Sequence, residues 1–158
     1  MTDSAMEQLY QQLILDHAKD PHGRGLVDGH SAESFQVNPM CGDEVRLRVH
    51  LAGPADARVV DRVSWEGQGC SISQASVSIM ADLVGDQPVA HVEHLGEAFR
   101  SLMHARGQGL DADTEDLLED ATAFTGVARY PARVKCALLG WAALRDALAQ
   151  AGAIEEET

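Results

Sequence analysis

The sequence is poor in cysteine and in basic residues. Its 158 residues include three cysteines and 12 lysines and arginines, against 25 aspartates and glutamates, so the formal net charge is −13. An odd number of cysteines fits a disulfide framework poorly. Because nucleic-acid binding requires clustered basic residues, the charge argues against a general nucleic-acid-binding protein. The acidity favours solubility and is compatible with a basic protein partner.

Long apolar stretches are also absent. No run of about 18 apolar residues occurs, so we expect no membrane span. The polar segment Met1–Gln8 has no apolar signal core, and we therefore expect a cytoplasmic protein whose thiols stay reduced. The segment Gly67–Gly69 lacks the third glycine and the Lys-Ser/Thr pair of a phosphate-binding loop. No local histidine signature of a cysteine hydrolase occurs either.

The length favours a single domain over residues 1–158, with an ordered core at 6–148 and an acidic tail at 149–158. Apolar and polar residues alternate in segments 35–37, 45–51 and 58–66, which predicts three sequential antiparallel strands. The segments before and after these strands have apolar residues at helical spacing. The pattern predicts an α+β fold, a small three-stranded antiparallel sheet with helices packed on one face. The expected helices cover 6–17, 71–84, 92–103, 113–123 (capped by Asp113 or Thr114) and 131–148.

The most informative stretch is Asn38–Asp43 (NPMCGD), a turn that holds a thiol and a carboxylate two residues apart. Cys70 lies between a glycine-rich strand end and a helix start, where backbone N–H groups favour a thiolate. Cys136 lies near the start of the last helix. All three cysteines therefore sit at the edges of elements. One tetrahedral metal site could be built from Cys41, Asp43, Cys70 and Cys136, although their spacing matches no local zinc motif.

The histidines are weaker candidates for metal ligands. His91 and His94 form an i, i+3 pair, but no cysteine or carboxylate that could share a site accompanies them, and a solvated helix start is the better interpretation. His17 lies on the apolar face of the first helix, and we expect it to be partly buried with a hydrogen-bond partner. We therefore include none of these histidines in the site.

Four segments resemble the IscU/SufU family of iron–sulfur cluster assembly proteins, and the resemblance covers Met6 to Leu148. In IscU-type scaffolds a histidine directly precedes the third cysteine, whereas this chain has Lys135 there. The segment before Cys136 is also longer, with an insertion around 102–119. Both departures are similar to the SufU branch of the family. The matching segments are Leu9–His17 (LYQQLILDH), Asn38–Asp43 (NPMCGD), Gly67–Ser73 (GQGCSIS) and Arg133–Cys136 (RVKC).

The resemblance implies the α+β fold and a zinc ion held by Cys41, Asp43, Cys70 and Cys136. It implies a sulfurtransferase that activates a pyridoxal-phosphate-dependent cysteine desulfurase of the SufS type and supplies downstream iron–sulfur scaffold proteins. Cys41, on the most movable loop, would accept the persulfide sulfur after a partner residue replaces it on the metal. Arg133 is a candidate for orienting the site or contacting the partner, or it is a solvated charge in the first helical turn.

Two alternatives stay open. An IscU-type scaffold would assemble a [2Fe–2S] cluster on the same ligands, and Lys135 counts against it. A zinc-stabilised adaptor would activate the desulfurase by docking alone, and its effect would survive loss of Cys41. Aerobically purified protein would be colourless with zinc in the transfer hypothesis and brown with iron in the scaffold hypothesis. The sequence leaves the metal, the sulfur acceptor, the oligomeric state and the docking surface open.

Overall fold

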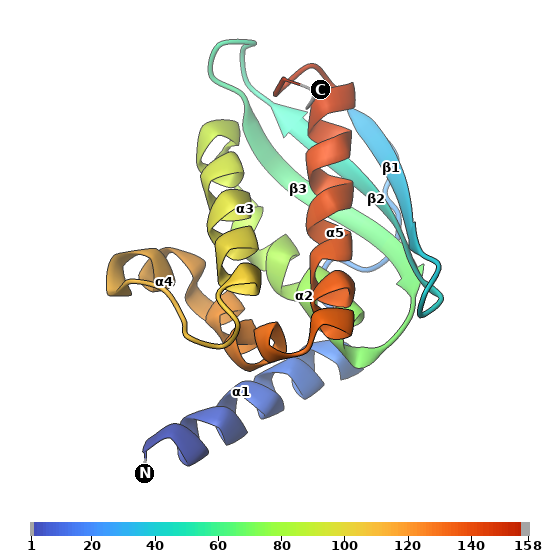
Figure 1. Cartoon of the computed structure of the whole chain (residues 1–158). Coiled ribbons are helices and arrows are strands. Elements are labelled where there is room, and N and C mark those ends of the chain that lie inside the picture. The colour runs from blue at the N-terminus through green and yellow to red at the C-terminus, as the bar shows by residue number, and fades with distance from the viewer. Residues whose placement is uncertain (1, 156–158) are drawn as a thin grey trace.

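Helices cover one face of a twisted sheet in the computed structural model, which describes residues 2–155 (Figure 1). The expected α+β fold is confirmed. Within residues 2–155, no helix is long and apolar enough to cross a membrane. The elements are α1 (Thr2–Lys19), β1 (Ala32–Asn38), β2 (Asp43–Ala52), β3 (Val59–Gln68), α2 (Ser71–Val84), β4 (Gln87–Pro88), α3 (Val89–His104), α4 (Ala112–Leu118), the 3₁₀ segment η1 (Glu119–Arg129) and α5 (Pro131–Gln150).

The sheet has four antiparallel strands in the order β1-β2-β3-β4. Its three long strands are those that the apolar alternation predicts. Alternate side chains of a strand share one face, and Val45, Leu47 and Val49 of β2 are accordingly buried in the core under the helices. The sequence predicts three strands, and the structure has a fourth. This strand, β4, is only two residues long and pairs with Val59 and Val60. A pairing of that length leaves no periodic signal in the sequence.

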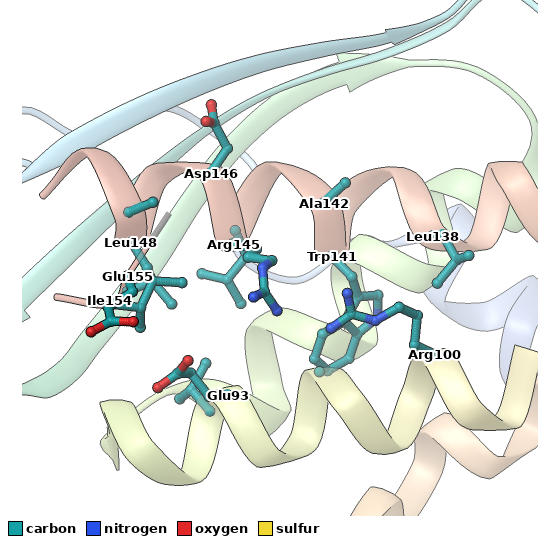
Figure 2. A pocket seen from close by; sticks show the side chains of 14 residues that line it. Glu93, Arg100, Leu138, Trp141, Ala142, Arg145, Asp146, Leu148, Ile154 and Glu155 are labelled. Carbon is teal, nitrogen blue, oxygen red and sulfur yellow. The ribbon is translucent and has the colours of Figure 1, made fainter. Parts of the chain in front are cut away.

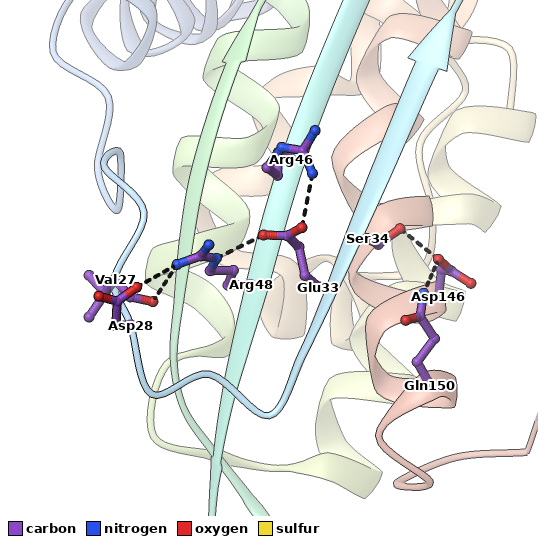
Figure 3. Close-up of polar contacts among 8 residues, drawn as sticks. All are labelled: Val27, Asp28, Glu33, Ser34, Arg46, Arg48, Asp146 and Gln150. Atoms are coloured by element: carbon purple, nitrogen blue, oxygen red, sulfur yellow. Dashed lines mark hydrogen bonds and ion pairs between the residues drawn. The ribbon is translucent and has the colours of Figure 1, made fainter.

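The edge strand β1 turns its polar side chains inward. Ser34 is buried, and its hydroxyl donates to the Asp146 carboxylate of α5 at 2.7 Å (Figure 3). Phe35 and Val37 are 46% and 47% exposed. The Arg46 guanidinium covers part of this apolar surface, 4.7 Å from the centre of the Phe35 ring. The apolar residues that mark the strand in the sequence therefore lie on its outer face.

Helices α2, α3 and α5 form the layer over the sheet (Figure 1). The predicted helix ends at Gly85 and Pro131 are confirmed, since Gly85 follows the last residue of α2 and Pro131 begins α5. Phe99 of α3 stacks on Trp141 of α5 with ring centres 5.0 Å apart. The predicted cap of α4 is wrong: Asp111, not Asp113 or Thr114, caps this helix by accepting a hydrogen bond from the Thr114 N–H at 3.0 Å.

Two helices continue beyond residues 6 and 148, the ends of the expected ordered core, and the single-domain organisation stays a prediction. Helix α1 begins at Thr2, α5 continues to Gln150, and Ile154 then packs against the core. A cavity of about 550 Å³ lies between α3 and α5, where Trp141 and Ile154 line it (Figure 2). None of the three cysteines lines this cavity. The end of the expected acidic tail, 156–158, lies outside the described residues.

Substitution of Gly140 tests the close packing of α5 on α2. A Cβ at this position would lie 2.5 Å from Cγ2 of the buried Val77. Overpacking of this kind costs about 1–3 kcal/mol, which exceeds the gain of about 1 kcal/mol that alanine brings to a helix interior. We expect Gly140→Ala to lower the free energy of unfolding by about 1 kcal/mol in urea denaturation followed by circular dichroism.

Gly126→Ala is the matched control for this substitution, because a Cβ there meets no atom within 4 Å. It should leave the free energy of unfolding unchanged or slightly raised. Equal stability of the two variants would contradict the close packing of the two helices.

Candidate metal centre

The turn between β1 and β2 brings Cys41 and Asp43 together. The Asn38 carbonyl oxygen accepts a hydrogen bond from the Gly42 N–H at 2.9 Å, and its side-chain oxygen accepts from the Met40 N–H at 3.2 Å. Gly42 has a φ of 71°, a left-handed conformation that glycine adopts without steric cost. In this turn the Cys41 thiol donates to the Asp43 carboxylate at 3.0 Å.

The start of α2 places Cys70 against the same carboxylate. The Cys70 N–H donates to Oδ1 of Asp43 at 2.9 Å, and the Cys70 Sγ lies 3.7 Å from Oδ2. This approach depends on Gly69, because a Cβ there would overlap the Asp43 carboxylate. The close approach of the backbone to Asp43 therefore requires a glycine at position 69. From the sequence alone, this glycine indicates only the end of a strand.

Cys136 joins the group from the start of α5. Its Sγ lies 3.4 Å from the Sγ of Cys41. Cys136 is buried, whereas Cys41 and Cys70 are exposed. Asp43 is only 1% exposed, its carboxylate accepts hydrogen bonds from Cys41 and Cys70, and a ligand atom of Cys136 lies within 4.8 Å of it. Three segments that are far apart in the sequence therefore meet at one buried carboxylate.

Burial and hydrogen bonding act in opposite directions on the groups of this site. Burial on its own raises the pKa of Asp43, but hydrogen bonds from the surrounding cysteines outweigh it and hold that pKa below its ordinary value. Burial, followed by the hydrogen bonds with Asp43 and Cys41, raises the pKa of the Cys136 thiol well above its usual range. Both shifts favour an ionised Asp43 carboxylate and a protonated Cys136 thiol in the absence of a cation. A metal cation reverses the preference of the thiol, because a coordinating thiol loses its proton.

The separations match those of a small tetrahedral ion. Ligand atoms of Cys41, Asp43 and Cys136 all lie within 4.8 Å of one another. An ion with bonds of about 2.0–2.3 Å holds its ligands about 3.3–3.8 Å apart, close to the 3.0, 3.4 and 3.7 Å seen here. Cys70 lies outside the group of three, and its thiol approaches the site through Asp43. Three sulfurs and one oxygen suit zinc or iron, and the assignment of these four ligands stays a prediction.

Arg133 and Lys135 lie beside the site but do not enter it. Both are exposed on the first turns of α5. The Arg133 guanidinium lies 6.0 Å from the centre of the Tyr130 ring. Arg133 forms no ion pair with any residue of 4–155, the part of the chain whose side chains are described. Its role in orienting the site or contacting a partner stays a prediction.

Comparison with known proteins decides the family, since residues 9–150 match the NifU-like N-terminal domain. The chain belongs to this family. It is 35% identical over 145 residues to the zinc-dependent sulfurtransferase SufU of Bacillus subtilis, covering 92% of each chain. It is also 34% identical to the iron–sulfur cluster assembly scaffold protein IscU of Streptococcus pyogenes, covering 94% of this chain and 87% of the relative. The resemblance inferred from the cysteine motifs is confirmed.

Solved structures agree with the fold of this NifU-like domain. The putative scaffold protein SufU of Fervidobacterium islandicum superposes with a TM-score of 0.71 at 32% identity, covering 87% of this chain and 94% of that one. The N-terminal part of a NifU-like protein of Brucella abortus has a TM-score of 0.75 at 22% identity, covering 90% and 94%. At that identity the second likeness shows the fold alone.

Among the described residues, no histidine belongs to the group of ligand atoms formed by Cys41, Asp43 and Cys136. His91 and His94 are on α3. His17 is buried, and its Nδ1 is 2.6 Å from the Ser78 hydroxyl, as expected for a histidine with an internal partner. Burial, with a smaller contribution from His22, lowers the pKa of His17.

Differential thiol reactivity tests this geometry in the metal-free protein. We expect brief iodoacetamide treatment at pH 8 to alkylate Cys41 and Cys70 readily and Cys136 much more slowly. Cys136 is buried, and its raised pKa leaves little of the reactive thiolate at that pH. Mass spectrometry of the digested protein measures the three rates, and alkylation under denaturing conditions is the control in which the three should converge. Alkylation of native Cys136 as fast as Cys41 would contradict the arrangement.

Proposed function

We propose that the protein carries sulfur for iron–sulfur cluster biogenesis, with zinc held by Cys41, Asp43, Cys70 and Cys136 and with Cys41 as the sulfur acceptor. One observation carries the proposal: three thiols from separate segments converge on one buried carboxylate, and Cys41, one of the two exposed thiols, lies in the turn between β1 and β2. The name of the Bacillus subtilis relative, a zinc-dependent sulfurtransferase, supports it.

The predicted ligands divide into anchors and one movable group. Zinc, when bound, would keep the thiols deprotonated. Asp43 is an anchor because it is buried and its Oδ1 accepts from the Cys70 N–H. Cys136 is an anchor because it is held within helix α5. Cys41 lies in an exposed turn next to Gly42, so it can turn outward with the least loss of packing.

The transfer step needs a thiolate and a persulfide. The Cys41 thiolate attacks the terminal sulfur of a persulfide on a cysteine desulfurase, and a new sulfur–sulfur bond forms on Cys41. The sulfur–sulfur bond of the donor breaks, and the donor cysteine leaves as a thiolate, so no oxidant is required. We propose a pyridoxal-phosphate-dependent desulfurase of the SufS type as donor, iron–sulfur scaffold proteins as recipients, and the cytoplasm as the location. Exposed Arg133 is the proposed partner contact near the site.

Replacement of Cys41 tests the acceptor role. We expect Cys41→Ser to accept less than a tenth of the sulfur that the unchanged protein accepts from the desulfurase and cysteine, because a hydroxyl cannot form a persulfide. Mass spectrometry after alkylation measures the added sulfur on each cysteine peptide. Full sulfur acceptance by Cys41→Ser would overturn the assignment.

The control is Arg133→Gln, which keeps all three thiols and changes only the proposed contact. It should retain the persulfide on Cys41 at saturating desulfurase while requiring more desulfurase to reach it. Desulfurase turnover measured with Cys41→Ser separates transfer from the adaptor hypothesis, since stimulation by an adaptor would persist without this thiol.

A scaffold function is the second candidate, and the named relatives are the observation in its favour. The Streptococcus pyogenes protein and a Thermotoga maritima protein, 34% identical over 90% of this chain, are both named as IscU scaffolds. Three thiols and a carboxylate can also bind iron in a cluster. Lys135 is exposed at the position where the scaffold histidine is expected, which favours sulfur transfer.

A further inference from the structure

A second group of potential metal ligands lies at the opposite end of α2 from Cys70. Ligand atoms of His17, His22 and Asp82 all lie within 4.8 Å of one another. His17 and Asp82 line a cavity of about 70 Å³, which exceeds the roughly 10–15 Å³ that one water requires. Asp82 is 12 residues along the chain from Cys70, or about 18 Å of helical rise. This group is therefore separate from the thiol site.

His17 is held in one orientation by a buried hydroxyl. It lies in the last turn of α1, and its Nδ1 is 2.6 Å from the Oγ of Ser78, which has no exposed surface. A hydroxyl oxygen has two lone pairs and can accept two hydrogen bonds. If Nδ1–H donates to Ser78, the lone pair of Nε2 is free to bind a cation. Such a partner on the second ring nitrogen is the usual support of a metal-binding histidine.

His22 is positioned through its backbone. Its N–H donates to the same Ser78 Oγ at 2.7 Å, and its carbonyl oxygen accepts from Nε1 of Trp65 at 2.8 Å. Next to it, the Gly23 carbonyl accepts from the Trp65 N–H at 3.1 Å. These bonds fix the loop after α1 against β3 and bring His22 Nδ1 to 2.5 Å from the Asp82 carboxylate. The arrangement is held in place before any ligand arrives.

We propose that His17, His22 and Asp82 form a second site, which binds a divalent first-row transition-metal ion such as Zn²⁺ or Co²⁺. Two imidazoles and one carboxylate are ligands that such ions prefer, and the remaining positions are left for water. Waters on the ion would face the cavity, where the acidic Glu119 and Asp120 of η1 can accept their hydrogen bonds. The oxygen-preferring Mg²⁺ and Ca²⁺ would bind weakly, because two of the three ligands are nitrogens.

Calorimetry on zinc-loaded protein tests the second site. The protein is loaded with only one equivalent of zinc, which the three thiolates bind ahead of the two imidazoles and the carboxylate of the second site, and titration with Co²⁺ should then show one further ion per chain. Co²⁺ does not displace zinc readily, because zinc binds more tightly in the usual order of affinities. We expect His22→Gln and Asp82→Asn to weaken this binding at least tenfold. Both side chains are exposed, so neither change opens a cavity in the core.

His94→Gln is the matched control, since His94 is an exposed histidine on α3. It should bind the further Co²⁺ as the unchanged protein does. The visible spectrum of bound Co²⁺ should lack a thiolate charge-transfer band. Such a band would appear if Co²⁺ had entered thiol sites left without zinc, so the spectrum of the unchanged protein distinguishes the two sites. The proposal is overturned by the absence of a further ion, by equal binding to His22→Gln, or by equal competition from Mg²⁺.

Discussion

The hydrogen bonds to the Asp43 carboxylate are the contacts on which the thiol site depends. The Cys70 N–H and the Cys41 thiol both donate to this group, and Cys136 lies against Cys41 on its other side. A buried carboxylate is costly unless it is paired or hydrogen-bonded. Here the start of α2 and the turn after β1 supply the partners, so the strand, the turn and the helix are held together by one anionic group.

Two glycines allow the close backbone approaches that hold the helices around this carboxylate. Gly69 lets the backbone before α2 pass next to Asp43, and Gly140 lets α5 pack on α2 at Val77. As a result, Cys70, which directly precedes α2, and Cys136, in the second turn of α5, are held by two helices that pack against each other. Cys41 lies in an exposed turn instead, and in the proposed function it is the thiol that moves. This division between fixed and movable thiols is what a protein needs if it is to hold a metal and pass on sulfur.

The sequence was sufficient to predict the order of the longer helices and strands and the approach of Cys41, Asp43, Cys70 and Cys136 to one another, because cysteine motifs and glycines are strong local signals. Their role as metal ligands stays a prediction. It could not predict β4, which is too short for a periodic pattern, or the outward direction of Phe35 and Val37, which follows from the hydrogen bond of Ser34 to Asp146 on α5. The approach of His22 to Asp82 was also hidden, since 60 residues separate them and the docking of the loop on Trp65 is a tertiary contact.

The central claim is that three sulfurs and one oxygen bind one ion. X-ray absorption at the zinc edge, on His22→Gln protein loaded with one equivalent of zinc, tests it most directly. The account predicts three sulfur neighbours at about 2.3 Å and one oxygen neighbour at about 2.0–2.2 Å, with the oxygen contribution altered in Asp43→Asn. A shell made mainly of nitrogen and oxygen, or one unchanged by the loss of the Asp43 carboxylate, would contradict it.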